Sequence, residues 1–261
     1  MILAAILLGT LIAGVGSVWL AALLSFGVLA RYTQHMLSLA AGALLATAFM
    51  HLLPEAFEGS GSAHNLFMVL LAGLIFFFLL DKAELWHHGH EHGHDHGAPS
   101  GAPHDHHKHA PLTGIWAVLV GDSVHCFGDG VLIASAFMAD LRLGVVASLA
   151  VLAHEVPHHM GDLSVLRSGP GDRRTAFVKV SLAGAVTALG GLLGFWLVER
   201  LQAYLPYFLV VASSSFIYVA LADLIPQLQK RLSARETAAQ ITWLAAGIGL
   251  VILVSGLAHA H

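Results

Sequence analysis

Two stretches of the sequence combine apolar residues with side chains that bind metal ions. Residues 115–137 read IWAVLVGDSVHCFGDGVLIASAF, and residues 145–162 read VVASLAVLAHEVPHHMGD. Imidazole, thiolate and carboxylate groups are the protein ligands of transition metals such as zinc. Polar groups are costly inside an apolar membrane helix and are usually functional there. These two segments are therefore the predicted site, and its predicted chemistry is the binding of a divalent cation.

Ligand-type residues in the first segment fall at helical spacing. Asp122, His125, Cys126 and Asp129 follow one another at steps of three, one and three. On a helix, His125 and Asp129 share a face, and Cys126 points about a quarter-turn away from it. A single intramembrane cysteine is more often a packed core residue, but its neighbours here favour a ligand role. The segment therefore predicts one side of a metal cage, with Asp122 one turn nearer the cytoplasmic end.

The second segment supplies the other side of the cage. His154, His158 and Asp162 repeat every four residues, and Glu155 and His159 stand beside them. The basic residues of the loops indicate that this helix runs antiparallel to the first. The two ligand sets are therefore expected to meet near the middle of the membrane. His159 points away from the face of His154 and His158. We therefore expect His159 at a helix contact or behind the ligands.

A hydrogen-bond network between two helices is the structural alternative for these residues. It would place three carboxylates and three imidazoles at one depth in lipid with no cation to neutralise them, which is costly. Pro157 lacks the amide that would bond the carbonyl of Ala153, and so frees a polar oxygen beside His154. Bent or broken helices of this kind form substrate sites in transporters. A metal site is therefore the favoured interpretation.

The composition places the whole chain in a membrane. Hydrophobic residues make up 57% and charged residues 11% of the 261 residues, and the mean hydropathy is +0.76. These values exclude an ordinary soluble domain and predict an all-α polytopic membrane protein, with residues 1–261 as a single transmembrane domain. The bilayer is an expected partner, and nucleic acid is not. Because Cys126 is the one cysteine, no disulfide forms within the chain.

Apolar segments of membrane-spanning length recur eight times, each near the ~20 residues that a bilayer requires. They cover residues 2–29, 36–57, 64–86, 112–138, 143–167, 174–198, 204–229 and 238–258. Ten basic residues fall in alternate loops, which leaves Arg142 and Arg200 in the others. By the positive-inside rule, both termini are predicted to be extracytoplasmic. The expected location is the plasma membrane, or the inner membrane in a bacterium.

Polar residues outside the central segments predict a route for the cation. His51 and Glu55, in HLLPEA, lie four residues apart on one helical face near the extracellular side. They are either interfacial residues near water or a first cation site, and the need for a supply route favours the second. Asp122, Asp162 and Asp223 lie toward the cytoplasmic ends of their spans, where a cation would leave.

The loop after the third span is the one low-complexity segment. Ten histidines stand among Gly, Pro, Asp and Glu between His87 and His109. Such a composition cannot pack a core but binds transition metals loosely. Residues 87–110 are therefore predicted to be a disordered cytoplasmic loop that buffers or senses the metal, with a neutral linker as the alternative. Its first cluster of metal-binding residues is His87, His88, His90, His92, His94 and His96.

The pair HCFGDG (125–130) and HEVPHHMGD (154–162) resembles the HNFxDG and HExPHExGD motifs of the ZIP family of zinc and iron transporters. Further stretches extend the likeness across essentially all eight spans: HLLPEA (51–56), the histidine-rich loop, LRSGPGDRRTA (166–176), TALGGLLG (187–194) and FIYVALADLIPQL (216–228). The resemblance implies a metal site, often binuclear, through which divalent cations move toward the cytosol, and it suggests a homodimer. Zn²⁺ is the expected cargo, with Cd²⁺, Fe²⁺ or Mn²⁺ as related ions, and no catalytic cofactor is expected. Alternating access is the expected mechanism.

The resemblance also implies ligands. The primary ligands are His125, Asp129, His154 and His158. At a neighbouring position, Asp129 is joined by Cys126 and Glu155. Two residues depart from the family pattern, because Cys126 replaces Asn and His159 replaces Glu. A thiolate is softer than an amide and favours zinc or cadmium over manganese or iron. An imidazole nitrogen faces one metal, so Asp129 is the expected bridge between two ions, and a site with one metal is the alternative.

Two other functions compete with a metal importer. HEVPH at 154–158 matches H-E-x-x-H, in which two histidines bind zinc and the glutamate is the general base of a metalloprotease. Such an enzyme would use Glu155 as the base and a third ligand such as Asp223, but it leaves the ligands of residues 115–137 unexplained. Pro157 between the histidines also argues against a rigid catalytic helix. A metal exporter would need other ligand spacings. We therefore predict a transporter and not an enzyme.

Overall fold

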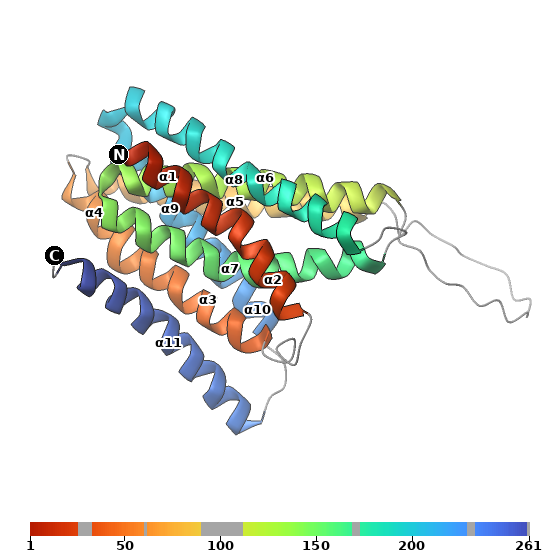
Figure 1. The fold of residues 1–261 in the computed structure, drawn as a ribbon. Coiled ribbons are helices and arrows are strands. Elements are labelled where there is room, and N and C mark those ends of the chain that lie inside the picture. The colour runs from red at the N-terminus through yellow and green to blue at the C-terminus, as the bar shows by residue number, and fades with distance from the viewer. Residues whose placement is uncertain (26–32, 60–61, 90–111, 169–172, 229–232, 260–261) are drawn as a thin grey trace, which may run out of the picture.

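A computed structural model describes residues 1–25, 33–59, 62–89, 112–168, 173–228 and 233–259. All regular elements in these ranges are helices, which lie side by side in one bundle (Figure 1). In chain order they are α1 (Ile2–Leu11), the π-helix η1 (Ile12–Gly16), α2 (Ser17–Ser25), α3 (Thr33–Thr47), the π-helix η3 (Ala48–Leu52), α4 (Leu53–Glu58), α5 (Ala63–Gly89), α6 (Leu112–Ala139), α7 (Leu141–Ser168), α8 (Arg173–Arg200), the 3₁₀-helix η4 (Gln202–Tyr204), α9 (Leu205–Tyr218), the π-helix η5 (Val219–Leu224), α10 (Ile225–Leu228) and α11 (Ala234–His259).

Consecutive helices without a gap form long rods, and each predicted span falls on one rod. Among the described residues, six rods are long and apolar enough to cross a membrane: Ile2–Leu24, Thr33–Glu58, Ala63–Leu80, Arg173–Arg200, Gln202–Leu228 and Ala234–Gly256. The remaining two, α6 and α7, have 28 residues each and carry the predicted ligands. The predicted all-α polytopic membrane architecture is thus confirmed. The number of eight spans and the side of each terminus stay predictions.

The bundle has two distinct ends. The start of α1 and the end of α11 lie close to one of them, and the helix ends that flank residues 90–111 lie at the other (Figure 1). Since α5 ends at Gly89 and α6 begins at Leu112, we call this second end the loop end. The cytoplasmic side predicted from the basic residues corresponds to the loop end.

Two of the three π-helical segments are explained by proline. Pro54 and Pro226 follow η3 and η5 within two residues, and a proline has no amide to donate to the carbonyl four residues back. The preceding amides shift accordingly, because Leu53 N–H bonds to Ala48 O and Ile225 N–H bonds to Ala220 O, each five residues back. Segments of this type are frequent at functional sites, and η5 contributes to the wall of the central cavity.

A short turn brings α6 and α7 together as an antiparallel pair. Only Asp140 separates them, and its Oδ1 accepts hydrogen bonds from the amides of Arg142, at 2.8 Å, and Leu143, at 3.3 Å. This side chain caps the first turn of α7. His125 lies fifteen residues before Asp140 and Glu155 fifteen residues after it, so equal helix lengths bring the two to one depth.

Glycines let α6 approach α8 at backbone distance. A Cβ atom added at Gly130 would lie 2.0 Å from the carbonyl oxygen of Thr187, and one added at Gly190 would lie 2.0 Å from that of Phe127. Small residues at such positions are typical of packed membrane helices. Because Phe127 and Gly130 flank Asp129, this contact fixes the rotation of α6 and hence the direction of its ligands.

Candidate metal centre

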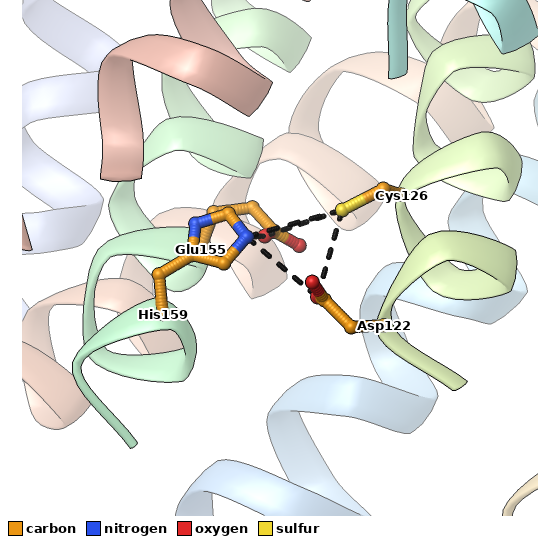
Figure 2. A group of neighbouring side chains, drawn as sticks. All are labelled: Asp122, Cys126, Glu155 and His159. Atoms are coloured by element: carbon orange, nitrogen blue, oxygen red, sulfur yellow. Dashed lines mark hydrogen bonds and ion pairs between the residues drawn. The ribbon is translucent and has the colours of Figure 1, made fainter. Parts of the chain in front are cut away.

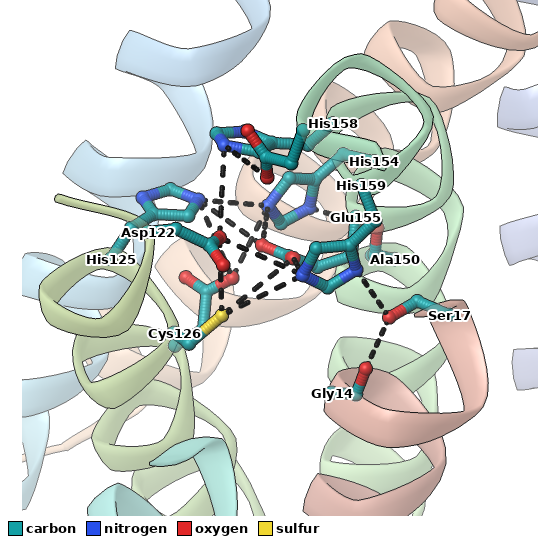
Figure 3. A network of polar contacts seen from close by, with 12 residues as sticks. Gly14, Ser17, Asp122, His125, Cys126, Ala150, His154, Glu155, His158 and His159 are labelled. Atoms are coloured by element: carbon teal, nitrogen blue, oxygen red, sulfur yellow. Dashed lines mark hydrogen bonds and ion pairs between the residues drawn. The ribbon is translucent and has the colours of Figure 1, made fainter. Parts of the chain in front are cut away.

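The facing sides of α6 and α7 carry a connected network of imidazole, carboxylate and thiol groups (Figure 3). Within the described residues it divides into three groups whose ligand atoms all lie within 4.8 Å of one another. We call them the first group (His125, Asp129, His154, Glu155), the second group (Asp122, Cys126, Glu155, His159) and the third group (Asp122, His158, Asp162).

In the first group, two imidazole nitrogens and two carboxylate oxygens point at a common centre. His154 Nε2 lies 3.2 Å from Asp129 Oδ2 and 3.3 Å from Glu155 Oε1. His125 Nε2 lies 3.2 Å from Glu155 Oε1, 3.4 Å from His154 Nε2 and 3.9 Å from Asp129 Oδ2. The predicted meeting of the two ligand sets at one depth is therefore present in the structure.

These separations fit a tetrahedral zinc ion. Zinc binds His nitrogen and carboxylate oxygen at about 2.0–2.2 Å, so neighbouring ligand atoms of a tetrahedral site stand about 3.3 Å apart. Four of the five distances in the first group fall between 3.2 and 3.4 Å. Little movement of His125, whose 3.9 Å contact with Asp129 is the longest, would complete the tetrahedron.

The backbone of α7 orients one of these imidazoles. His154 Nδ1 lies 3.4 Å from the carbonyl oxygen of Ala150, one turn earlier. A carbonyl only accepts, so a hydrogen bond here puts the ring proton on Nδ1 and leaves the Nε2 lone pair for the centre of the first group. Such support by the other ring nitrogen is the usual arrangement of metal-binding histidines.

The second group adds the thiol of Cys126 (Figure 2). Cys126 Sγ lies 3.7 Å from Asp122 Oδ1, 3.9 Å from Glu155 Oε2 and 4.0 Å from His159 Nε2. His159 Nε2 lies 3.2 Å from Glu155 Oε2 and 3.6 Å from Asp122 Oδ1. The separations from sulfur are longer, as expected because zinc–sulfur bonds are about 2.3 Å. All four residues are buried.

Glu155 joins the two groups. Its Oε1 belongs to the first group and its Oε2 faces His159 and Cys126 in the second. We expected Asp129 to be the bridge, but Asp129 lies in the first group alone. The reason is that Glu155 projects from α7 between the two faces of α6 that carry His125 and Cys126. A carboxylate with one oxygen on each side can bridge two cations.

His158 is not with the other expected primary ligands. Its ring stacks on that of His125, with centroids 5.3 Å apart and an angle of 11° between the planes. Its Nε2 instead faces Asp162 Oδ2 at 3.6 Å and Asp122 Oδ1 at 3.8 Å. Since His158 is one turn further along α7 than His154, it forms the third group nearer the loop end, and Glu155 takes the fourth position in the first group.

His159 contacts the ligand network more directly than its sequence position predicts. The expected helix contact exists, because His159 Nδ1 lies 2.9 Å from Ser17 Oγ. The same ring also presents Nε2 to the second group, which was not predicted. The available signal was its spacing: His159 follows Glu155 by four residues and so shares a face with it.

Buried carboxylate oxygens concentrate around these groups. Asp122 Oδ2, Asp129 Oδ2, Glu155 Oε1 and Asp162 Oδ2 are inaccessible and meet no donor at favourable hydrogen-bond angles within the described part of the chain. A buried charge is costly unless a counter-charge neutralises it. Four such oxygens within two helical turns favour a bound cation over a purely structural network.

A cavity of about 420 Å³ connects the network to the loop end. The first group contributes His125 and His154 to its wall, and the third group contributes all its members. The rest of the wall comes from the halves of the helices nearest the loop end, including Leu37, Leu80 and Gln227. Among the described residues, Cys126, Glu155 and His159 do not line it, so Asp122 is the one member of the second group on the cavity wall.

Other predicted residues lie away from this network. His51 lies on η3 and Glu55 is exposed on α4, and neither lines the cavity formed by the described residues. The side chains of Asp223, His87 and His88 lie outside the described residues, as do His90, His92, His94 and His96 entirely. The roles predicted for these residues stay predictions.

Comparison with known proteins shows the family to which the chain belongs. The sequence matches the family described as ZIP Zinc transporter over residues 1–110 and 82–255. The chain belongs to the ZIP zinc transporter family. Zinc transporter ZIP13 of Pongo abelii is 29% identical over 95% of this chain and 77% of its own length. Human zinc transporter ZIP4 is 34% identical over 52% of this chain but only 20% of its own length. Human zinc transporter ZIP10 is 34% identical over 47% of the chain and 17% of its own length.

Membership of the ZIP family confirms the resemblance and, with the apolar rods, makes the chain an integral multi-pass membrane protein. The relatives are named as transporters, which gives the metalloprotease alternative no support. The geometry agrees with this, because both oxygens of Glu155 face other ligands of the network. The departures from the family motifs, Cys126 and His159, both fall in the second group of this ZIP protein.

Proposed function

We propose that this ZIP protein carries divalent transition-metal cations, zinc above all, across the membrane toward the cytoplasm. The observation that carries the proposal is the first group, which combines tetrahedral separations with two members on the wall of a cavity. Two imidazoles and two carboxylates bind zinc well enough to replace its water shell. They bind it less tightly than four thiolates would, and a transport site must also release its ion.

The third group supports release toward the loop end. His158 and Asp162 stand one turn beyond His154 and Glu155 on α7, and Asp122 one turn beyond His125 on α6. The stacked rings of His125 and His158 place the two groups next to each other. A cation leaving the first group therefore meets a second set of ligands, all of which lie on the cavity wall. The proposed route runs through Asp122 and Asp162, with Asp223 as a further predicted step.

The distribution of charge supports the direction. Described basic residues near the loop end outnumber those at the other: Lys82, Arg173, Arg174, Lys179 and Arg235 against Arg142 and Arg200. The excess marks the cytoplasmic side of a membrane protein. A cavity that reaches this end corresponds to the cytoplasm-facing state of an alternating-access cycle, and the extracytoplasmic state would expose the first group by way of His51 and Glu55. The histidine-rich segment 87–110 would then receive the ion.

The test is zinc uptake into proteoliposomes that contain the purified full chain. Uptake above that of protein-free vesicles is expected for the intact protein and is expected to fall to background in Asp129→Asn, which keeps the shape of the side chain and removes its charge. Asp140→Asn is the matched control, since Asp140 caps α7 outside the network. Unchanged uptake in Asp129→Asn would refute a route through the first group.

A further inference from the structure

The second group has a contact with a third helical rod. Ser17 begins α2 and is completely buried, and its Oγ lies 2.9 Å from His159 Nδ1 (Figure 3). The hydroxyl proton of Ser17 has its own acceptor, the carbonyl oxygen of Gly14 in η1. A chain of contacts thus runs from the backbone of the first rod through Ser17 and His159 to Cys126, Glu155 and Asp122.

Close packing fixes the position of Ser17. A Cβ atom added at Gly14 would lie 2.0 Å from the carbonyl oxygen of Gly184, so η1 lies directly on the backbone of α8. Ser17 follows η1 immediately, and Val18 next to it is also fully buried. The hydroxyl therefore has little freedom to leave His159, and it contacts the ring from the side opposite to the ligands.

Proton counting assigns the tautomer of His159. A serine hydroxyl has one proton, and Ser17 donates it to Gly14 O. The Ser17 oxygen can then only accept, so the hydrogen bond to His159 requires the proton on Nδ1. Neutral His159 consequently has its lone pair on Nε2, the nitrogen that faces Glu155 Oε2 and Asp122 Oδ1.

We propose that Ser17 is a positioning residue that holds His159 as the Nδ1–H tautomer, so that His159 Nε2 coordinates a soft divalent metal ion together with Asp122, Cys126 and Glu155. His154 provides the precedent within the same protein, because its Nδ1 is near Ala150 O and its Nε2 faces the first group. The two histidines differ in the helix that provides the hydrogen bond to Nδ1. His154 takes it from its own helix, and His159 takes it from the first rod, so the second group depends on the contact of that rod with α7.

The inference rests on the proposed function only in treating the network as a metal site, and a spectroscopic test separates the two. Cys126 is the one cysteine of the chain, so thiolate-to-metal charge transfer reports the second group alone. The histidines of segment 87–110 also bind metal but have no sulfur and give no such band. Loss of an outer-shell partner of a metal-binding histidine typically lowers metal affinity by about 10- to 100-fold.

The experiment is a Co²⁺ titration of the purified full chain in detergent, followed by the near-ultraviolet thiolate-to-Co²⁺ band. The intact protein should develop the band, and Ser17→Ala should shift its midpoint to about 10- to 100-fold higher Co²⁺. Ser17→Thr should restore the midpoint, because it keeps a hydroxyl on Cβ. The matched control is Ser148→Ala: Ser148 is buried where α7 meets Gly9 of α1, and its hydroxyl bonds Gly144 O away from the second group.

Three outcomes would overturn the proposal. They are an intact protein without the thiolate band, an unshifted midpoint in Ser17→Ala, and an equal shift in Ser148→Ala, which would show a general effect of losing a buried hydroxyl. If Ser17→Thr does not fold, the comparison of Ser17→Ala with Ser148→Ala still decides. Zinc uptake measured on the same preparations tests the proposed function independently, since an intact protein with the band but without uptake would refute transport alone.

Discussion

The first and second groups share Glu155 yet differ in chemistry and in surroundings. The first has nitrogen and oxygen ligands, and its His125 side chain is 26% exposed on the cavity wall. The second contains the thiol, and its His159 is 0% exposed behind that wall. A transported ion must reach and leave its ligands in every cycle, whereas a retained ion needs no route for release. We propose from this comparison that the first group carries the moving ion and that the second tunes it through the shared carboxylate.

The difference also follows the helices that support each group. The four ligands of the first group, and the carbonyl of Ala150 that orients His154, all belong to α6 and α7. The second requires the first rod as well, through Ser17. Changes that affect only one of these supports should therefore separate the two groups, and changes in the shared packing should affect both.

The largest effect is expected for His154→Ala. It removes an Nε2 that lies within 3.4 Å of three other ligands of the first group. Zinc uptake should fall by about 100-fold or more, beyond the 10- to 100-fold typical of outer-shell partners. Uptake into proteoliposomes measures this, and His64→Ala on the exposed start of α5 is the control. Near-normal uptake in His154→Ala would place the transported ion elsewhere.

A change in the shared packing should weaken both groups together. Gly130→Ala would force α6 away from Thr187 on α8, and overpacking of this kind costs about 1–3 kcal/mol. The melting temperature, zinc uptake and the thiolate-to-Co²⁺ band should all decrease. Gly128→Ala is the matched control, because its added Cβ would meet no described atom within 4 Å. A loss of one activity with the other intact would mean that α6 does not position the groups jointly.

A smaller effect is expected at the third group. Asp162→Asn removes a charge 3.6 Å from His158 on the wall of the cavity. Because the first group keeps all its ligands, the uptake rate should fall only about fivefold, equivalent to about 1 kcal/mol. The thiolate-to-Co²⁺ midpoint should stay close to that of the intact protein. A larger change in that midpoint than in uptake would contradict the assignment of Asp162 to the route of release.

The smallest effect on zinc is expected for Cys126→Asn, which restores the residue of the family motif. Zinc uptake should change by about twofold, since the first group keeps all its ligands. Competition by cadmium should weaken more and competition by manganese should strengthen, because an amide oxygen is harder than a thiolate. Uptake of zinc in the presence of each competing ion measures this. An unchanged order of competition would remove Cys126 from the determinants of selectivity.

Much of this arrangement could be predicted from the sequence because its signals are local. Helical spacing placed His125 beside Asp129 and His158 beside Asp162, and apolar length predicted the helical rods. Because the turn at Asp140 is one residue long, the depth of each ligand set follows from its distance in residues from Asp140. These features depend on residues within a few turns of one another.

Contacts between distant helices could not be predicted in the same way. The rotation of α6 against α7 decides that Glu155 and not Asp129 is shared, and that His158 turns to Asp122 and Asp162. That rotation comes from glycine contacts with α8, which spacing along α6 does not specify. Ser17 is 142 residues from His159 and stands in an apolar segment without a motif, so only the fold brings it to the site.

The most direct test of the comparison is zinc uptake in two double variants, His125→Ala/His154→Ala and Cys126→Ala/His159→Ala. The variants remove two ligands each and leave Glu155 in place. With both proteins shown to be folded, uptake should fall to background in the first and stay measurable, at a reduced rate, in the second. Uptake that persists without His125 and His154, or that stops only without Cys126 and His159, would contradict the assignment of the transported ion to the first group.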